Sequence, residues 1–186
     1  MAVLERPLAE RASSERAAAS RTALIALLQL AYSGELAAAH AYRGHARSVS
    51  KPEERAAIEE IERDEWHHRE LVGRMLAELG AGPDRSRERR SAVIGRVLGF
   101  LCHVSGWLAP MWGAGRLESR NVREYEEAAR LARAAGRGEW VDCLLTMAEV
   151  EWDHERYFRE RVLSHRLARF VPMWTVPPPR ESIRTG

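Results

Sequence analysis

One pattern of glutamate, tyrosine and histidine residues occurs twice along the chain. Its first copy is Glu35, Tyr42, Glu65 and His68, and its second copy is Glu118, Tyr125, Glu151 and His154. In both copies six residues separate the first glutamate from the tyrosine, and two residues separate the second glutamate from the histidine. Because carboxylates and imidazoles are metal ligands, the repeat indicates metal chemistry. Since the two histidines occupy matching positions, the repeat also predicts that loss of either one has the same effect.

The Glu-x-x-His spacing places both side chains on one face of a helix, about one turn apart, so both can bind in the same metal region. The single glutamate that begins each copy would supply bridging or terminal oxygen atoms from another helix. Four carboxylates and two imidazoles that met inside a bundle would be strongly destabilising without cations. Two divalent metal ions would remove this cost, and oxygen and imidazole ligands with few thiols suit iron or manganese.

Chance matches are a competing explanation, because 23 residues of the chain are glutamates. One Glu-x-x-His in such a sequence carries little information, and solvated surface charges would explain it. Two copies at similar distances behind Glu-x6-Tyr, on helices predicted independently, favour a metal centre over solvated charges.

The segments that carry the repeat have the composition of helices. They are rich in Ala, Leu, Glu and Arg, and no stretch alternates between apolar and polar residues as a half-buried strand would. Ser50 and Glu53 form a capping box that predicts a helix start. We predict an all-α fold, an antiparallel four-helix bundle with a long crossover segment between the second and third helices. The four helices are expected at about residues 20–48, 52–79, 117–135 and 139–169.

The expected crossover segment has two parts. Residues 84–90 are interpreted as a charged, mostly basic linker, and residues 97–115 hold no charged side chain apart from the titratable His103. A stretch of 19 such residues reaches the length of a transmembrane helix, but it is interrupted by Gly99, Gly106, Pro110 and Gly113. We therefore expect it to pack along the bundle with an exposed apolar face. The Pro-rich tail at residues 170–186 is expected to be extended.

Size and composition indicate one domain over residues 1–186, with the bundle at about residues 20–169. The 186 residues are 45% hydrophobic and 30% charged, which excludes a disordered or collagenous chain. A net charge of +2 gives no reason to expect nucleic-acid binding, and two cysteines cannot form a four-thiolate metal site. The N-terminal residues hold no apolar stretch of signal-peptide length, so we expect a cytoplasmic protein.

At the repeated residues the chain resembles the ferritin-like di-iron carboxylate superfamily, and most of all its rubrerythrin and demethoxyubiquinone hydroxylase branches. The resemblance covers about residues 27–163 and implies that Tyr42 and Tyr125 are catalytic-site residues that hydrogen-bond ligand carboxylates. No Cys-x-x-Cys pair is present, so the electron-transfer module of full rubrerythrins is missing. The metal ligands that the resemblance implies are Glu35, Glu65, His68, Glu118, Glu151 and His154.

Two metal-dependent functions and one structural role follow as hypotheses. The first is a di-iron hydroxylase that uses dioxygen, an external electron donor and a hydrophobic, quinone-like substrate. The long uncharged crossover segment favours such an enzyme, because it would meet an apolar substrate. The second is a rubrerythrin-like peroxidase or ferroxidase without an organic substrate. The third is a purely structural helical module. For the metal-dependent protein we expect two iron ions, with manganese as the alternative metal, a homodimer, and peripheral contact with the inner membrane.

Overall fold

The computed structural model describes residues 8–185, which form five α-helices and three short 3₁₀ turns within that range. The helices are α1 (Leu8–Ser48), α2 (Pro52–Glu78), α3 (Arg85–Leu101), α4 (Leu108–Ala134) and α5 (Val141–Ser164). The fold class is therefore all-α, as the sequence predicts.

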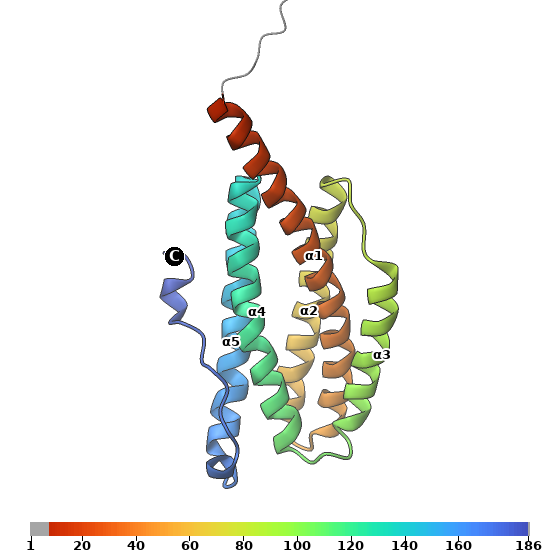
Figure 1. Ribbon diagram of the computed structural model, residues 1–186. Helices are drawn as coiled ribbons and strands as arrows, with labels where there is room; N and C mark the ends of the chain where they lie inside the picture. The colour runs from red at the N-terminus through yellow and green to blue at the C-terminus, as the bar shows by residue number, and fades with distance from the viewer. Residues whose placement is uncertain (1–7, 186) are drawn as a thin grey trace, which may run out of the picture.

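The helices α1, α2, α4 and α5 make the bundle, and α3 lies outside it. The helices α1 and α2 pack as one pair, α4 and α5 as another, and α1 also packs against α4. The helix α3 packs against the outer side of α1 and connects the two pairs, as Figure 1 shows. Figure 1 also shows α1 extending past the ends of its neighbours. The predicted crossover segment is thus mostly helical.

The packing of α3 on α1 depends on glycine. A Cβ atom at Gly95 would clash with the backbone of Ala37, and one at Gly44 would clash with the backbone of Gly99. The two helix backbones are therefore in direct contact, which only residues without a side chain allow. The larger apolar residues of α3 point elsewhere, and Val97, Phe100 and others on this helix are exposed.

Several predicted helix boundaries are wrong. The first helix begins at Leu8 rather than near residue 20, because its Ala-rich start has high helix propensity. Residues 84–90 are not a linker: Asp84 accepts hydrogen bonds from the backbone N–H groups of Ser86 and Arg87 and caps α3. The helix α4 begins at Leu108, since Pro110 lies in its first turn, where proline is tolerated.

Two further details differ from the prediction. The N-cap of α2 is Lys51, without a side-chain hydrogen bond, so the capping box at Ser50 is wrong. The helix α5 ends at Ser164 rather than near residue 169. The uncharged stretch at residues 97–115 is divided between α3 and α4 by a turn in which Gly106 has a φ of 77°, and it has the expected exposed apolar residues.

A different helix, α1, has the length and hydropathy of a membrane span over Glu10–Ser48. It lies within the bundle, however, and contributes buried residues such as Leu24 and Leu28 to its interior. A core helix passes the same test of length and hydropathy.

The interior consists of two apolar clusters with a polar layer between them. One cluster includes Leu28, Val72 and Leu144, and the other includes Ile58 and Phe158. On each of the four bundle helices the repeated glutamates and histidines lie between residues of the two clusters. The apolar packing thus holds the helices together on both sides of the polar layer.

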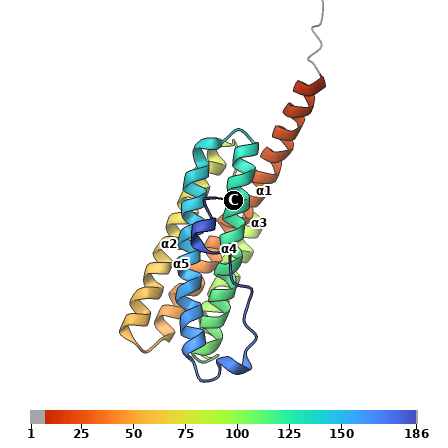
Figure 2. The same cartoon turned by 90° about the vertical axis from the view of Figure 1, so that its left-hand side faces the viewer.

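The C-terminal tail lies along α4 and α5, as Figure 2 shows. The buried Trp174 donates a hydrogen bond to Glu155 over 2.7 Å, and its ring occupies the space that a side chain at Gly115 would need. The buried Ile183 reaches the apolar cluster of Leu28. Most of the tail is extended, apart from 3₁₀ turns at Ala168–Phe170 and Arg180–Ser182.

Candidate metal centre

All six repeated glutamates and histidines meet in the polar layer, and each is at most 6% exposed. The helix α1 contributes Glu35 and α4 contributes Glu118, while α2 and α5 each contribute a glutamate and a histidine one turn apart. These side chains meet because each lies on the face of its helix that continues the apolar stripe toward the bundle axis.

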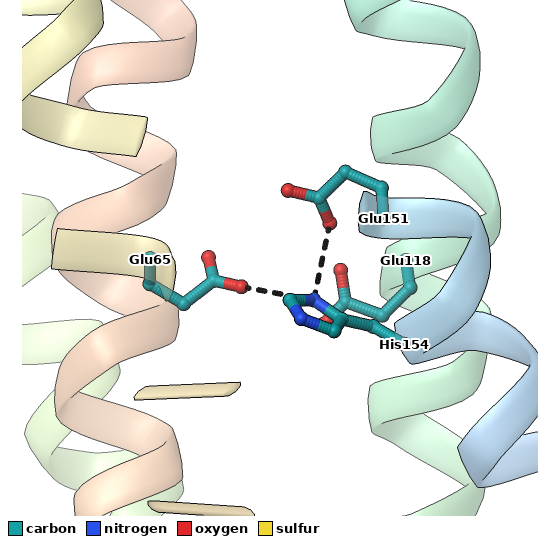
Figure 3. Close-up of side chains that lie close together, drawn as sticks. All are labelled: Glu65, Glu118, Glu151 and His154. Atoms are coloured by element: carbon teal, nitrogen blue, oxygen red, sulfur yellow. Dashed lines mark ion pairs between the residues drawn. The ribbon is translucent and has the colours of Figure 1, made fainter. Parts of the chain in front are cut away.

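The six residues form two overlapping groups whose potential ligand atoms lie within 4.8 Å of one another. One group is Glu65, Glu118, Glu151 and His154, and the other is Glu35, His68 and Glu151. Figure 3 shows the first group, with Glu65 reaching across from α2 toward the three residues on α4 and α5. Because Glu151 belongs to both groups, the arrangement fits two neighbouring metal ions that share a carboxylate.

Both histidines direct the same ring nitrogen toward the carboxylates. The Nδ1 atom of His68 lies 2.9 Å from Glu151 Oε1, without the alignment of a hydrogen bond. The Nδ1 atom of His154 lies 3.7 Å from Glu65 Oε1 and 3.9 Å from Glu151 Oε2. Both imidazole rings therefore face the carboxylates through Nδ1, at distances of 2.9 to 3.9 Å.

Buried atoms without hydrogen-bond partners test whether the residues fit a metal. Such atoms are expensive in a protein interior, and each one calls for an explanation. In the polar layer they are Glu35 Oε2, both carboxylate oxygens of Glu65, Glu151 Oε1, and the Nδ1 atoms of His68 and His154. Four carboxylate oxygens and two imidazole nitrogens that face one another make a suitable donor set for two divalent cations, so the residues fit.

The two tyrosines of the repeat hydrogen-bond the glutamates of the opposite copy. Tyr42 donates its hydroxyl hydrogen to Glu118, and Tyr125 donates to Glu35. Both tyrosines are buried, so each orients a carboxylate of the cluster from outside. The exchange is reciprocal, as expected for two similar halves packed face to face.

The comparison with family models agrees with this geometry. The model for the family described as ubiquinone biosynthesis protein COQ7 matches residues 22–127. The chain belongs to this family. No curated protein and no solved structure matched the chain.

The COQ7 family consists of demethoxyubiquinone hydroxylases, which are ferritin-like di-iron enzymes of the monooxygenase type. Membership therefore makes the chain a ferritin-like bundle and a non-haem di-iron oxidoreductase. The match includes the first four clustered residues along the chain and ends before Glu151 and His154. The structure places these two beside the others, whereas the ligand role of each residue stays a prediction.

Burial and crowding shift the pKa values of the clustered carboxyl groups of this COQ7-family chain. Burial raises the pKa of Glu65 and of Glu118 well above the usual range, and it also raises the pKa of Glu35. Burial opposes ionisation of Glu151 as well, but its neighbours Glu118 and His68 lower its pKa overall. Without metal, the layer therefore retains protons at neutral pH, and cations would replace them.

Two cavities open beside the cluster of glutamates and histidines, between α1 and α4. The larger one, of about 400 Å³, is an apolar cleft that α3 also borders. Tyr42, whose hydroxyl contacts Glu118, forms part of its wall. The smaller one, of about 180 Å³, is lined by Glu35 and Glu124, and burial raises the pKa of Glu124 to about 7. The apolar cleft is thus the larger of these two openings near the cluster.

Three further residues at this site were not predicted from the sequence. Asn121 donates hydrogen bonds to Glu118 over 3.0 Å and to Glu151 over 3.3 Å, and its position three residues after Glu118 was a usable signal. Asp64 contacts His154, which no local spacing reveals. His45 is buried against Tyr42 and Phe158 and forms part of the cleft.

Proposed function

We propose that this COQ7-family chain hydroxylates a quinone-like aromatic substrate that enters through the apolar cleft between α1, α3 and α4. The observation that supports the proposal is the shared wall: Tyr42 lines the cleft and holds Glu118 of the metal cluster. A cavity of about 400 Å³ is within the usual size range of small-molecule sites. Its walls are almost entirely apolar, and Leu98, Leu101 and Leu117 are among them.

In this proposal the metal ligands are the six clustered residues, and the metal is iron. The two iron ions, when bound and reduced, supply electrons that activate dioxygen. The substrate C–H becomes C–OH, the second oxygen atom leaves as water, and an external donor supplies two electrons with two protons. Tyr42 and Tyr125 keep Glu118 and Glu35 oriented, and the apolar walls exclude water from the substrate ring.

The exposed face of α3 supports a position at the surface of the inner membrane. Leu98 and Leu101 line the cleft and are 46% and 43% exposed, while the nearby Phe100 and Val104 are both 67% exposed. The apolar surface therefore continues from the outside of α3 into the cleft. A lipid-soluble quinone could pass along this surface without crossing water, with the rest of the protein on the cytoplasmic side.

The hydroxylase family and the cleft both favour hydroxylation over the peroxidase or ferroxidase alternative. The test is dioxygen consumption by the iron-loaded, reduced protein, with and without a demethoxyubiquinone analogue that carries a short tail. We expect the analogue to stimulate consumption and to gain one oxygen atom by mass spectrometry. The proposed hydroxylation would be refuted if hydrogen peroxide rapidly oxidised the reduced, iron-loaded protein and the analogue had no effect on dioxygen consumption.

A further inference from the structure

Asp64 contacts the metal cluster from outside. It precedes Glu65 on α2, yet its Oδ2 atom lies 3.0 Å from Nε2 of His154 on α5. This nitrogen is the one that does not face the cluster, because Nδ1 of the same ring faces Glu65 and Glu151. The Asp64 side chain is 40% exposed, so its charge is at the rim of the layer.

The contact determines what His154 can do. A carboxylate that accepts a hydrogen bond from Nε2–H keeps the proton on that nitrogen and leaves the Nδ1 lone pair directed inward. It also holds the ring plane in place and makes the imidazole a stronger donor to a metal. His154 is therefore prepared for metal binding by a residue outside the repeat.

The other histidine lacks this support. Within residues 8–185 the only carboxylate within 4.0 Å of a His68 ring nitrogen is that of Glu151, on the cluster side. In the second copy of the repeat, the residue that corresponds to Asp64 is Val150, which has no hydrogen-bonding side chain. The two copies are alike in their glutamates and histidines but differ at the position that contacts the opposite histidine.

We propose that Asp64 is a positioning residue that makes the two metal sites unequal, so that the site containing His154 binds metal more tightly than the site containing His68. The proposal rests on the metal centre of the proposed function and adds an order of filling to it. It differs from the prediction from the repeat that loss of either histidine has the same effect.

The test is a titration of the metal-free protein with Mn²⁺, in which electron paramagnetic resonance counts the free ion. The variants are Asp64→Ala, which removes the acceptor, and Asp64→Asn, which keeps an acceptor oxygen. The matched control is Asp153→Ala, because Asp153 is adjacent to His154 in sequence and 43% exposed, but faces Arg156 and Arg180. Circular dichroism of each metal-free variant checks that it is folded.

We expect the parent to bind two Mn²⁺ ions in two steps. Asp64→Ala should weaken the tighter step by about 10- to 100-fold and leave the other unchanged, with partial recovery in Asp64→Asn. The control should match the parent. The inequality of the two sites would be refuted if Asp64→Ala changed neither binding step or weakened both steps equally. It would also be refuted if Asp153→Ala had the same effect as Asp64→Ala. In each of these cases the metal centre itself would stand. A parent that binds no metal would refute the proposed function and this inference with it.

Discussion

Gly113 lies on α4 in the wall of the apolar cleft, and a leucine there should obstruct the cleft without damaging the fold. A Cβ atom at this position would meet no other heavy atom within 4 Å, and the residue is exposed within a regular helix. The new side chain would therefore occupy space at the cleft rather than space used by helix packing.

The expected effects on stability and on activity have opposite signs. Replacing a helical glycine by leucine stabilises a protein by roughly 0.8 kcal/mol, which corresponds to about 2 to 3 °C in melting temperature for a chain of this length. Crowding a bound substrate costs about 1 to 3 kcal/mol, which lowers kcat/KM by roughly 5- to 150-fold. Iron content should not change, because Gly113 is not one of the clustered residues.

The assay is steady-state dioxygen consumption with the short-tailed quinone analogue, together with melting curves and iron content. The matched control is Gly34→Leu, because Gly34 is also helical and open to space but lines the smaller cavity. We expect Gly113→Leu to lose far more activity than the control while both gain stability. Full activity in Gly113→Leu would show that the substrate does not use the apolar cleft, and selective loss in Gly34→Leu would assign entry to the smaller cavity.

Four further outcomes are expected. Glu65→Ala and Glu151→Ala should each lose at least one bound metal by elemental analysis, and unchanged metal content would contradict the ligand assignment. The metal-free protein should lose stability as pH rises from about 4.5 to neutrality, because the raised pKa values of Glu65 and Glu118 mean that the folded state holds more protons than the unfolded state; bound metal should abolish this trend. Burial lowers the pKa of His45 to about 4, so between pH 6.5 and 4 mainly the unfolded state takes up the proton. The free energy of unfolding of the parent should therefore fall by roughly 3 kcal/mol relative to that of His45→Gln as pH falls from 6.5 to 4. Parallel curves of unfolding free energy against pH would argue against a buried neutral imidazole. Trp174→Ala should cost about 3 kcal/mol in denaturant unfolding and make the tail sensitive to protease, and a protease-resistant tail would show that other contacts hold it.

Helix content and the face of each helix could be predicted from the sequence because both depend on local spacing. The steps of three and four residues place Glu65 and His68 on one face of a helix whatever that helix packs against. The same rule applies to Glu151 and His154, so their approach in the structure followed from the pattern alone. Boundaries were less predictable, since the helical start at Leu8 and the capping role of Asp84 depend on small differences in propensity.

The contacts between helices depended on the tertiary structure. Tyr42 and Tyr125 were expected to hydrogen-bond carboxylates, but their crossed pairing with Glu118 and Glu35 joins residues of opposite halves. The same holds for Asp64 and His154, whose separation along the chain hides their contact. A periodic pattern states which way a side chain points from its own helix, but the crossing angle and rotation of the partner helix decide what it meets. The sequence by itself therefore determined the helices and the chemistry of the candidate ligands, and the packing decided how the two halves combine and why their two histidines differ.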